Sequence, residues 1–404
     1  MKRALVMSTA VLLTGCAVSP NPSVAVPTES ATASLVPSGA APSQSFVIES
    51  SPADVLTYRG DAARTGQMPG PAPAGTPAVA WRYQASRGFH SSAVVADGLV
   101  FAVSDDGTVH AVGLTDGEVR WTVDLGADAS GSPLVSGECV VIGDHDGVIH
   151  ALSTVNGEAC WTHALGRSVS GSAVDAGPVL VAATENGSVH ALDPITGDEA
   201  WVTQLSATVT RSISAAGGVI YVGVGGGALV ALDQTNGAER WRTQVSVTGE
   251  ISTPTIADGR VFVGAGLDSD SPAAHKVVAL DAATGESLWE YASPEQAQLY
   301  TPSVAGGQAY VIGHDGRIVS LDAATGSVTW SVTVGDLEAL PAIVGDVLYT
   351  ATNEDRALAV ELATGDELWS VPISGIPYGP TVTGGVMLVT TDVGNLYAIA
   401  GLEP

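Results

Sequence analysis

Tryptophan recurs along this chain at intervals close to 40 residues, and this repeat constrains the fold more than any other feature. The spacings are 40, 40, 40, 40, 48, 41 and 39 residues within a sequence of 404 residues. Periods of this length are typical of propellers and solenoids, in which each copy is one supersecondary unit. The chain is therefore expected to be built from copies of one unit. The repeat positions are Trp81, Trp121, Trp161, Trp201, Trp241, Trp289, Trp330 and Trp369.

Each unit carries the signals of four short strands. In the first unit, runs rich in β-branched residues at 99–103 and 108–112 flank the turn Asp106-Gly107, which is a hairpin signal. Another run, at 91–95, precedes them, and a Trp-bearing run at 119–123 follows. No helical period lies between units, so each is predicted to form a four-stranded antiparallel meander, with strands A to D in chain order. A glycine four residues before each of the last seven Trp indicates a turn at fixed register: Gly117, Gly157, Gly197, Gly237, Gly285, Gly326 and Gly365.

The two ends of the repeat region complement each other. After Trp369 the sequence supplies runs for strands A to C, from Thr381 to Tyr397, without a Trp-bearing strand D. The segment around Trp81 is a strand D with no strands A to C before it. Pairing the two would complete an eighth blade and leave no exposed sheet edge. The predicted fold is therefore all-β, an eight-bladed β-propeller of four-stranded antiparallel blades over residues 52–404, with the ring closed by the N-terminal strand.

A recurring motif precedes strand D. Residues 191–201 read Ala-Leu-Asp-Pro-Ile-Thr-Gly-Asp-Glu-Ala-Trp, and the segments ending at Trp241, Trp289 and Trp330 are similar. The pattern Ala-Leu-Asp-x-x-Thr-Gly-x-x-x-Trp resembles the motif of the pyrroloquinoline-quinone-type (PQQ-like) repeat family. The resemblance covers about residues 58–400 and implies a β-propeller.

The Asp of this motif is expected to accept backbone hydrogen bonds in its own turn rather than bind a metal. Gly113, Ser153 and Glu361 replace it in blades one, two and seven. Residues 58–66, which include Arg-Gly-Asp, resemble the segment that often precedes the first strand in this family. They are interpreted as a packed lead-in rather than a cell-adhesion signal.

The N-terminus has the features of a lipoprotein signal peptide at 1–15. Met-Lys-Arg is followed by an apolar stretch at 4–13, about half the ~20 residues that a membrane span needs. Leu13-Thr14-Gly15-Cys16 resembles a bacterial lipobox, which implies lipid attachment to Cys16. An ordinary secretory signal with an incidental cysteine is the alternative. The protein is therefore expected to be exported and lipid-anchored, at the cell membrane or the outer membrane.

Residues 16–51 are predicted to be the lipidated Cys and a disordered tether. Positions 17–51 are rich in Ala, Ser, Pro, Thr and Val and lack Lys, Arg, Trp and Tyr, so they cannot bury enough apolar surface to fold.

The charge of the chain excludes one class of partner. Removal of Lys2 and Arg3 with the signal peptide would leave 13 basic residues, 15 less 2, against 42 acidic ones, a net charge of −29. Nucleic acid and anionic lipid surfaces would be repelled, because both are bound through basic surfaces.

Two cysteines could suggest a disulfide and three histidines could suggest a metal site, but both sets have simpler structural interpretations. Cys139 and Cys160 fall on strands B and D of one blade, where strands two apart lie about 9 to 10 Å from each other, beyond the roughly 7 Å Cα limit for a disulfide. Separate buried thiols are therefore favoured, unless a bulge brings the two together.

His110, His150 and His190 each lie eleven residues before a Trp, which favours a shared packing position on strand C over a metal site.

One end of the ring carries variable polar residues. The D-to-A loops and B-to-C turns share this end, which also receives residues 144–146, 314–315 and a blade-five insertion at 266–275. A partner or ligand is expected to bind here, and solvated loop ends without a ligand are the alternative. The candidate residues in these loops are His90, Arg211, Glu250, Tyr300 and Tyr378.

The family contains both enzymes and binding proteins. In its quinoprotein alcohol dehydrogenases the cofactor stacks on a spare Trp and against a disulfide of adjacent cysteines, beside a calcium ion. Here the repeat uses all eight Trp, and no adjacent cysteines occur. The expectation is a non-catalytic scaffold without cofactor, metal or catalytic residues, which binds another protein at the cell envelope and resembles the lipid-anchored BamB-type propellers. The alternative is a PQQ-dependent or other small-ligand-binding quinoprotein-like enzyme or sensor.

Overall fold

This computed structural model describes residues 45–247, 249–267, 275–337 and 339–403. The described residues all belong to the second of the two units into which the chain divides, Ala31–Pro404. The predicted signal peptide, Cys16 and the tether up to residue 44 lie outside the described residues, as do residues 268–274 of the blade-five insertion.

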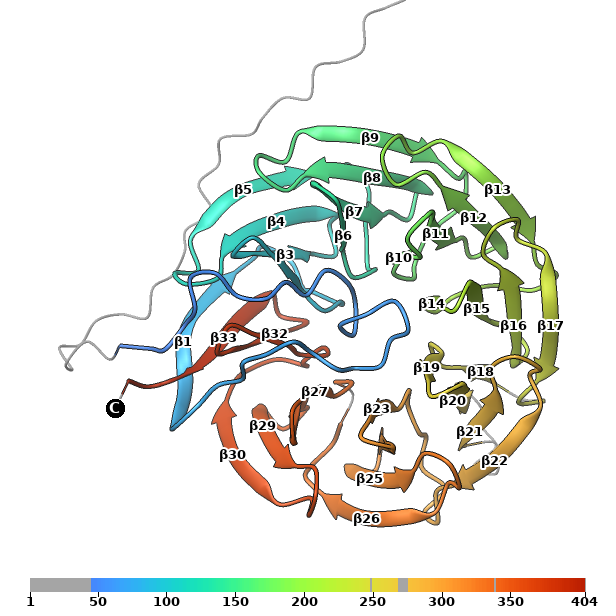
Figure 1. The fold of residues 1–404 in the computed structure, drawn as a ribbon. Coiled ribbons are helices and arrows are strands. Elements are labelled where there is room, and N and C mark those ends of the chain that lie inside the picture. Colours follow the sequence, from blue (N-terminus) through green and yellow to red (C-terminus); the bar gives the residue numbers. More distant parts are fainter. Residues whose placement is uncertain (1–44, 248, 268–274, 338, 404) are drawn as a thin grey trace, which may run out of the picture. The chain divides into compact units, whose positions relative to one another are not determined.

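The described residues form eight antiparallel β-sheets arranged in a ring (Figure 1), which confirms the predicted eight-bladed β-propeller. In seven sheets the strand order follows the chain, from an inner strand A to an outer strand D. No helix in the described part of the chain is long and apolar enough to span a membrane.

The strands have the following bounds. Blades one to four contain β2 (Val94–Ala96), β3 (Leu99–Val103), β4 (Thr108–Gly113) and β5 (Val119–Asp124); β6 (Leu134–Ser136), β7 (Cys139–Gly143), β8 (Val148–Ser153) and β9 (Ala159–Ala164); β10 (Val174–Asp175), β11 (Leu180–Ala183), β12 (Ser188–Leu192) and β13 (Glu199–Gln204); and β14 (Ser214–Ala216), β15 (Val219–Val224), β16 (Ala228–Asp233) and β17 (Glu239–Gln244). Blades five to eight contain β18 (Glu250–Ile251), β19 (Thr255–Ala257), β20 (Arg260–Leu267), β21 (Lys276–Asp281) and β22 (Ser287–Ala292); β23 (Ser303–Ala305), β24 (Gln308–Ile312), β25 (Arg317–Asp322) and β26 (Val328–Thr333); β27 (Ala342–Val344), β28 (Val347–Thr352), β29 (Arg356–Glu361) and β30 (Glu367–Pro372); and β31 (Thr381–Thr383), β32 (Val386–Thr390), β33 (Asn395–Gly401) and β1 (Pro77–Gln84).

The eighth sheet combines strands from both ends of the described chain. Its order is β1-β33-β32-β31, so the strand that contains Trp81 lies outside the three C-terminal strands. Trp81 is paired with Ala398 in an antiparallel register.

Blade five departs from the four-stranded pattern. Its inner strand is divided into β18 and β19, and both pair with β20. Pro254 lies in the gap between them, and proline has no N–H to donate to a strand neighbour.

The Trp residues join neighbouring blades. The first seven donate an indole N–H to a backbone carbonyl of the next blade at 2.8–3.2 Å, as Trp161 does to Pro194. The same ring lies against the glycine of the next blade's turn: a Cβ on Gly197 would lie 2.5 Å from Trp161. Gly197 also has a φ of +75°. The backbone of its turn and the adjacent Trp161 ring therefore both require glycine at this position.

The Asp of the repeated motif acts in its own turn, as expected. Asp193 Oδ1 accepts hydrogen bonds from the backbone N–H groups of Ile195 and Thr196. Equivalent bonds form at Asp233, Asp281 and Asp322.

Residues 55–71, which we call the lead-in, run along the inner strands of all eight blades. Backbone N–H groups of strand A residues donate to lead-in carbonyls in blades one, two, four, five, six and seven, as Ala215 does to Ala62 at 2.8 Å. Arg64 donates to Ala173 O beside strand A of blade three, and Gly70 forms a bridge with Thr383 of blade eight. The lead-in thus pairs with inner sheet edges that would otherwise be exposed.

Residues 45–51 pack against the eighth sheet, which corrects the C-terminal end of the predicted tether. Phe46 forms a bridge with Leu402, and the N–H of Glu49 donates to Gly384 O at 2.9 Å. Phe46 and Ile48 are half-buried against the apolar cluster between blades eight and one. The small and polar composition of the whole segment conceals this short apolar alternation.

Cys139 and Cys160 form a disulfide, which corrects the expectation of separate buried thiols. They lie two strands apart, yet their Cα atoms are 6.6 Å from each other. The register of β8 and β9 shifts between Ala151 and Leu152, so that Cys160 is the extra residue of a β-bulge. The bulge brings Cys160 within bridging distance across β8. Cys160 is exposed and Cys139 is half-buried.

Candidate binding face

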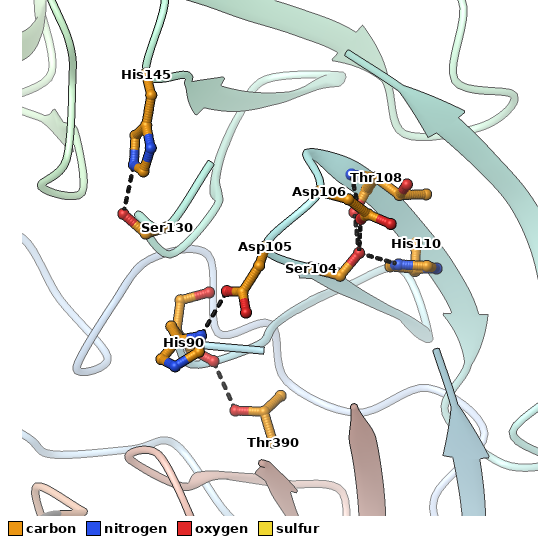
Figure 2. Close-up of polar contacts among 10 residues, drawn as sticks. His90, Ser104, Asp105, Asp106, Thr108, His110, Ser130, His145 and Thr390 are labelled. Atoms are coloured by element: carbon orange, nitrogen blue, oxygen red, sulfur yellow. Dashed lines mark hydrogen bonds and ion pairs between the residues drawn. The ribbon is translucent and has the colours of Figure 1, made fainter. Parts of the chain in front are cut away.

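The D-to-A loops and B-to-C turns meet at one end of the ring, which we call the cavity face. In blade one, His90 of the loop contacts Asp105 of the turn, and Ser104, Asp106 and His110 form a network beside them (Figure 2). In blade two, Ser130 bonds to His145 Nε2 at 2.9 Å (Figure 2). In these two blades the loop is therefore held by the turn that follows it in the same blade.

The structure places the five candidate residues in three groups. The rings of His90 and Tyr378 lie 5.1 Å apart between their centroids. Arg211 Nε lies 3.5 Å from a carboxylate oxygen of Glu250. The Tyr300 hydroxyl lies 3.4 Å from Nδ1 of His314, on the B-to-C turn of blade six.

These groups surround a central cavity of about 340 Å³. Four of the five candidates line it, whereas Glu250 lies outside the lining and reaches it through Arg211. All eight blades contribute, and most lining side chains are hydroxyls or glycines. The lining comprises Tyr58, His90, Ser91, Ser92, Ser130, Gly131, Ser132, Ser170, Gly171, Ser172, Thr210, Arg211, Ser212, Ser252, Thr253, Leu267, Tyr300, Thr301, Leu340, Tyr378 and Gly379.

The hydroxyl lining was missed by the sequence interpretation, which singled out only charged and aromatic residues. Its signal is present as Ser-Gly-Ser at 130–132 and again at 170–172. In the structure the backbone N–H of Ser92 donates to Ser132 Oγ at 3.0 Å, and that of Ser132 donates to Ser172 Oγ at 2.9 Å. The N–H of Ser172 donates to Ser212 Oγ at 3.1 Å, so the serines link four successive blades.

The lead-in lies beneath the cavity. Tyr58 is part of the lining, and the guanidinium of Arg64 lies 5.5 Å from the centre of its ring. Arg59 and Arg64 are buried, which confirms that this segment is packed. Burial lowers the pKa of Arg64 to about 10, so the side chain stays protonated at neutral pH.

The three strand C histidines each have a different partner. His110 lies between the Tyr83 hydroxyl and Ser104 Oγ, at 2.9 Å from each. His150 Nε2 lies 2.7 Å from Asp144, and His190 Nδ1 lies 2.7 Å from Glu199. The shared strand position therefore serves local hydrogen bonding in each blade. Burial lowers the pKa of His110 to about 4.

A sequence profile described as outer membrane protein assembly factor BamB matches residues 73–215 and 185–401. This chain belongs to that family. No curated protein matches the sequence of this BamB-like propeller.

Solved structures share the fold at low sequence identity. BamB from Moraxella catarrhalis superposes with a TM-score of 0.67 and 18% identity, over 80% of this chain and 99% of that one. Quinohemoprotein alcohol dehydrogenase from Comamonas testosteroni superposes with a TM-score of 0.67 and 15% identity, over 86% of this chain and 80% of that one. A europium-containing methanol dehydrogenase gives a TM-score of 0.69 and 12% identity, over 86% and 98%. The fold of the BamB-like propeller is therefore shared with an outer membrane assembly factor and with dehydrogenases.

The residues at the cavity do not fit the quinone arrangement described above for the alcohol dehydrogenases. No Trp is part of the described lining, because the repeat places these rings between blades. The disulfide joins Cys139 of β7 to Cys160 of β9 rather than two adjacent cysteines. This chain therefore offers the cofactor neither of those stacking surfaces.

Proposed function

We propose that this BamB-like propeller is an exported, lipid-anchored envelope protein that acts as a non-catalytic scaffold and binds another protein through its cavity face. The family match supports an envelope role. The observation that carries the proposal is that every blade sends loop residues to one cavity, while the repeat Trp residues are committed to the blade junctions. Aromatic and Arg side chains at the rim, such as Tyr300, Tyr378 and Arg211, are of the types that dominate protein interfaces.

Crosslinking in intact cells tests which face binds a partner. A photoreactive amino acid at Arg87 or Asp128 would sit in an exposed D-to-A loop of the cavity face. Matched positions in C-to-D turns are Val155 and Ile195, which are 79% and 83% exposed. We expect one partner protein to be crosslinked from the first pair and not from the second. Crosslinking from Val155 and Ile195 alone would show that the opposite face binds.

Replacing the five candidate residues tests the rim directly. Changing His90, Arg211, Glu250, Tyr300 and Tyr378 together to Ala should abolish this crosslink, and Tyr300→Ala or Tyr378→Ala should have the largest single effect. The double variant Val155→Ala/Ile195→Ala is the control and should keep the crosslink. Unchanged crosslinking in the fivefold variant, with its fold intact by circular dichroism, would contradict the assignment.

A further inference from the structure

The described lining of the central cavity differs in charge from the chain as a whole. The chain has 42 Asp and Glu against 15 Lys and Arg. Among the described residues that line the cavity there are Arg211 and His90 but no carboxylate. Glu250 and Asp105, which contact these two side chains, lie outside the lining. The described part of the lining therefore contains no negative side chain that would repel a negative group.

The wall offers hydrogen-bond donors without protein acceptors. Ser132, Ser172 and Ser212 each accept a backbone N–H bond from the preceding blade, and none of their hydroxyls donates to another described residue. Ser91 Oγ and Ser170 Oγ are buried atoms with no hydrogen-bond partner among the described residues, and Ser91 is only 6% exposed. A hydroxyl has one hydrogen to donate, so this wall matches a ligand rich in acceptors.

A buried cation lies under the same wall. Arg64 donates to the carbonyls of Ala173 and Ile213 at 2.7 and 3.1 Å, and these residues directly follow Ser172 and Ser212 of the lining. Its other acceptors are the hydroxyl of Thr57 and the carbonyl of Tyr58. None of these acceptors is a carboxylate, and the charge of Asp61 acts on the guanidinium without a hydrogen bond between the two. In a low-dielectric interior such a charge stabilises an anion nearby.

We infer that the cavity binds a carboxylate group carried by an extended peptide segment, an inference that rests on the proposed scaffold function. A carboxylate only accepts hydrogen bonds and can receive several at once, and bonds to a charged acceptor are stronger than neutral ones. The cavity of about 340 Å³ falls in the range of roughly 300–1,000 Å³ for ligand sites. The carboxylate can belong to the C-terminus of the segment or to an Asp or Glu side chain.

Short labelled peptides distinguish these two sources without knowledge of the partner. The full-length protein in detergent is titrated, by fluorescence anisotropy, with acetyl-Gly-Ser-Gly-Ser-Gly bearing a free C-terminal carboxylate, with its C-terminal amide, and with acetyl-Gly-Ser-Glu-Ser-Gly amide. We expect the neutral amide to bind about tenfold more weakly than at least one charged peptide, since hydrogen bonds to charged groups dominate the contact. The charged peptide that binds identifies the source.

Two isosteric variants test the charge argument at one position. Ser170→Asp places a carboxylate in the cavity wall, whereas Ser170→Asn has the same size without the charge. We expect Ser170→Asp to abolish binding of the charged peptide and Ser170→Asn to retain more of it. Ser91→Ala should weaken binding without lowering the melting temperature, because its hydroxyl has no protein partner. Ser331→Ala, at an exposed position on β26, is the matched control.

Equal binding of the neutral and charged peptides, equal binding by Ser170→Asp and Ser170→Asn, or no binding of any peptide would overturn the inference. In each case the crosslink from Arg87 or Asp128 would still be present if the scaffold function is right. Loss of that crosslink from the wild-type protein, with carboxylate binding retained, would instead contradict the scaffold function alone.

Discussion

At the scale of the residue, the turn before strand D requires glycine for two separate reasons. Gly197 has a positive φ, and the indole ring of Trp161 occupies the space that a side chain would need. Gly166 has nearly the same φ, +76° against +75°, but no atom within 4 Å of an added Cβ. Comparing an added side chain at Gly197 and at Gly166 therefore separates the cost of backbone strain from the cost of a clash with the Trp ring of the neighbouring blade.

Gly197→Ala should destabilise the protein more than Gly166→Ala. The second change carries only the backbone cost of about 1 kcal/mol, and the first adds roughly 1–3 kcal/mol for overpacking against Trp161. Urea unfolding of both variants, followed by tryptophan fluorescence, measures the difference. Equal losses would show that the Trp ring moves aside without cost.

His110 couples stability to pH through its burial. Desolvation lowers its pKa from 6.5 to about 4, partly opposed by the charge of Asp106. The unfolded chain then binds a proton near pH 6.5 that the folded protein does not bind until near pH 4. This contribution to stability is complete above pH 6.5 and is lost progressively as the pH falls towards 4, by up to about 3 kcal/mol.

His110→Gln should reduce the loss of stability between pH 7.5 and pH 4.5. The variant loses hydrogen bonds at both pH values, so the quantity to compare is the difference in unfolding free energy between them. His163→Gln, on the outer strand β9, is the control and should follow the wild type. An unchanged pH difference in His110→Gln would assign the acid sensitivity to other groups.

At the scale of the element, a bulge recurs in every Trp-bearing strand. The residue before Trp is the extra one in each outer strand, as Cys160 is before Trp161. Strand periodicity predicted the strands and their turns, but the sequence alone does not say at which residue a bulge shifts the alternation. The pairing of Cys139 with Cys160 could not be predicted for this reason.

Removing the disulfide should lower the stability of the propeller. The two cysteines are 21 residues apart, and closing a loop of this length is worth about 3 kcal/mol in the unfolded-chain model. Cys139→Ser/Cys160→Ser should therefore melt at a lower temperature than the wild type. A reducing agent should lower the melting temperature of the wild type and leave the double variant unchanged. No response of the wild type to reduction would contradict a disulfide in solution.

The candidate face was predictable in position but not in composition. Chain order and the meander place His90, Arg211, Tyr300 and Tyr378 at one end, and the structure has all four around one cavity. The eight serines among its 21 described lining residues have no individual signature, since serine is also common in turns. Their role depends on the meeting of eight loops, which no single repeat contains.

For the whole molecule, the N-terminal segments should differ sharply in their effect on stability. Deleting residues 17–44 should leave the melting temperature nearly unchanged, because their composition predicts a tether that does not fold. Deleting residues 17–51 should lower it, because Phe46 and Ile48 cover the eighth sheet. Deleting residues 52–88 removes β1 and the lead-in and should cause aggregation.

Differential scanning calorimetry and size-exclusion chromatography measure these outcomes. A large drop in melting temperature after deletion of 17–44 would show that the predicted tether is folded. A soluble, cooperative protein without residues 52–88 would show that seven blades and an incomplete eighth are sufficient.

Membrane attachment is expected to depend on one residue. Cys16→Ala should prevent labelling with a radioactive fatty acid and should leave the folded propeller unaffected. Cys139→Ser is the control, because this cysteine is bonded to Cys160 and should not affect labelling. Unchanged labelling of Cys16→Ala would contradict the lipoprotein prediction.

The lead-in ties the number of blades to the length of a segment outside the repeat. Its carbonyls accept N–H groups of the inner strands in six blades, from Val55 at Val95 in blade one to Gly66 at Ile343 in blade seven, and the side chain of Arg64 reaches blade three. Propellers of different size differ by whole units of roughly 40 residues. Here a ninth blade would have an inner strand with no lead-in residue beside it. Loss of one blade would leave lead-in residues with no inner strand beside them. A change in blade number would therefore alter the match between the length of residues 55–71 and the circumference of the ring of inner strands.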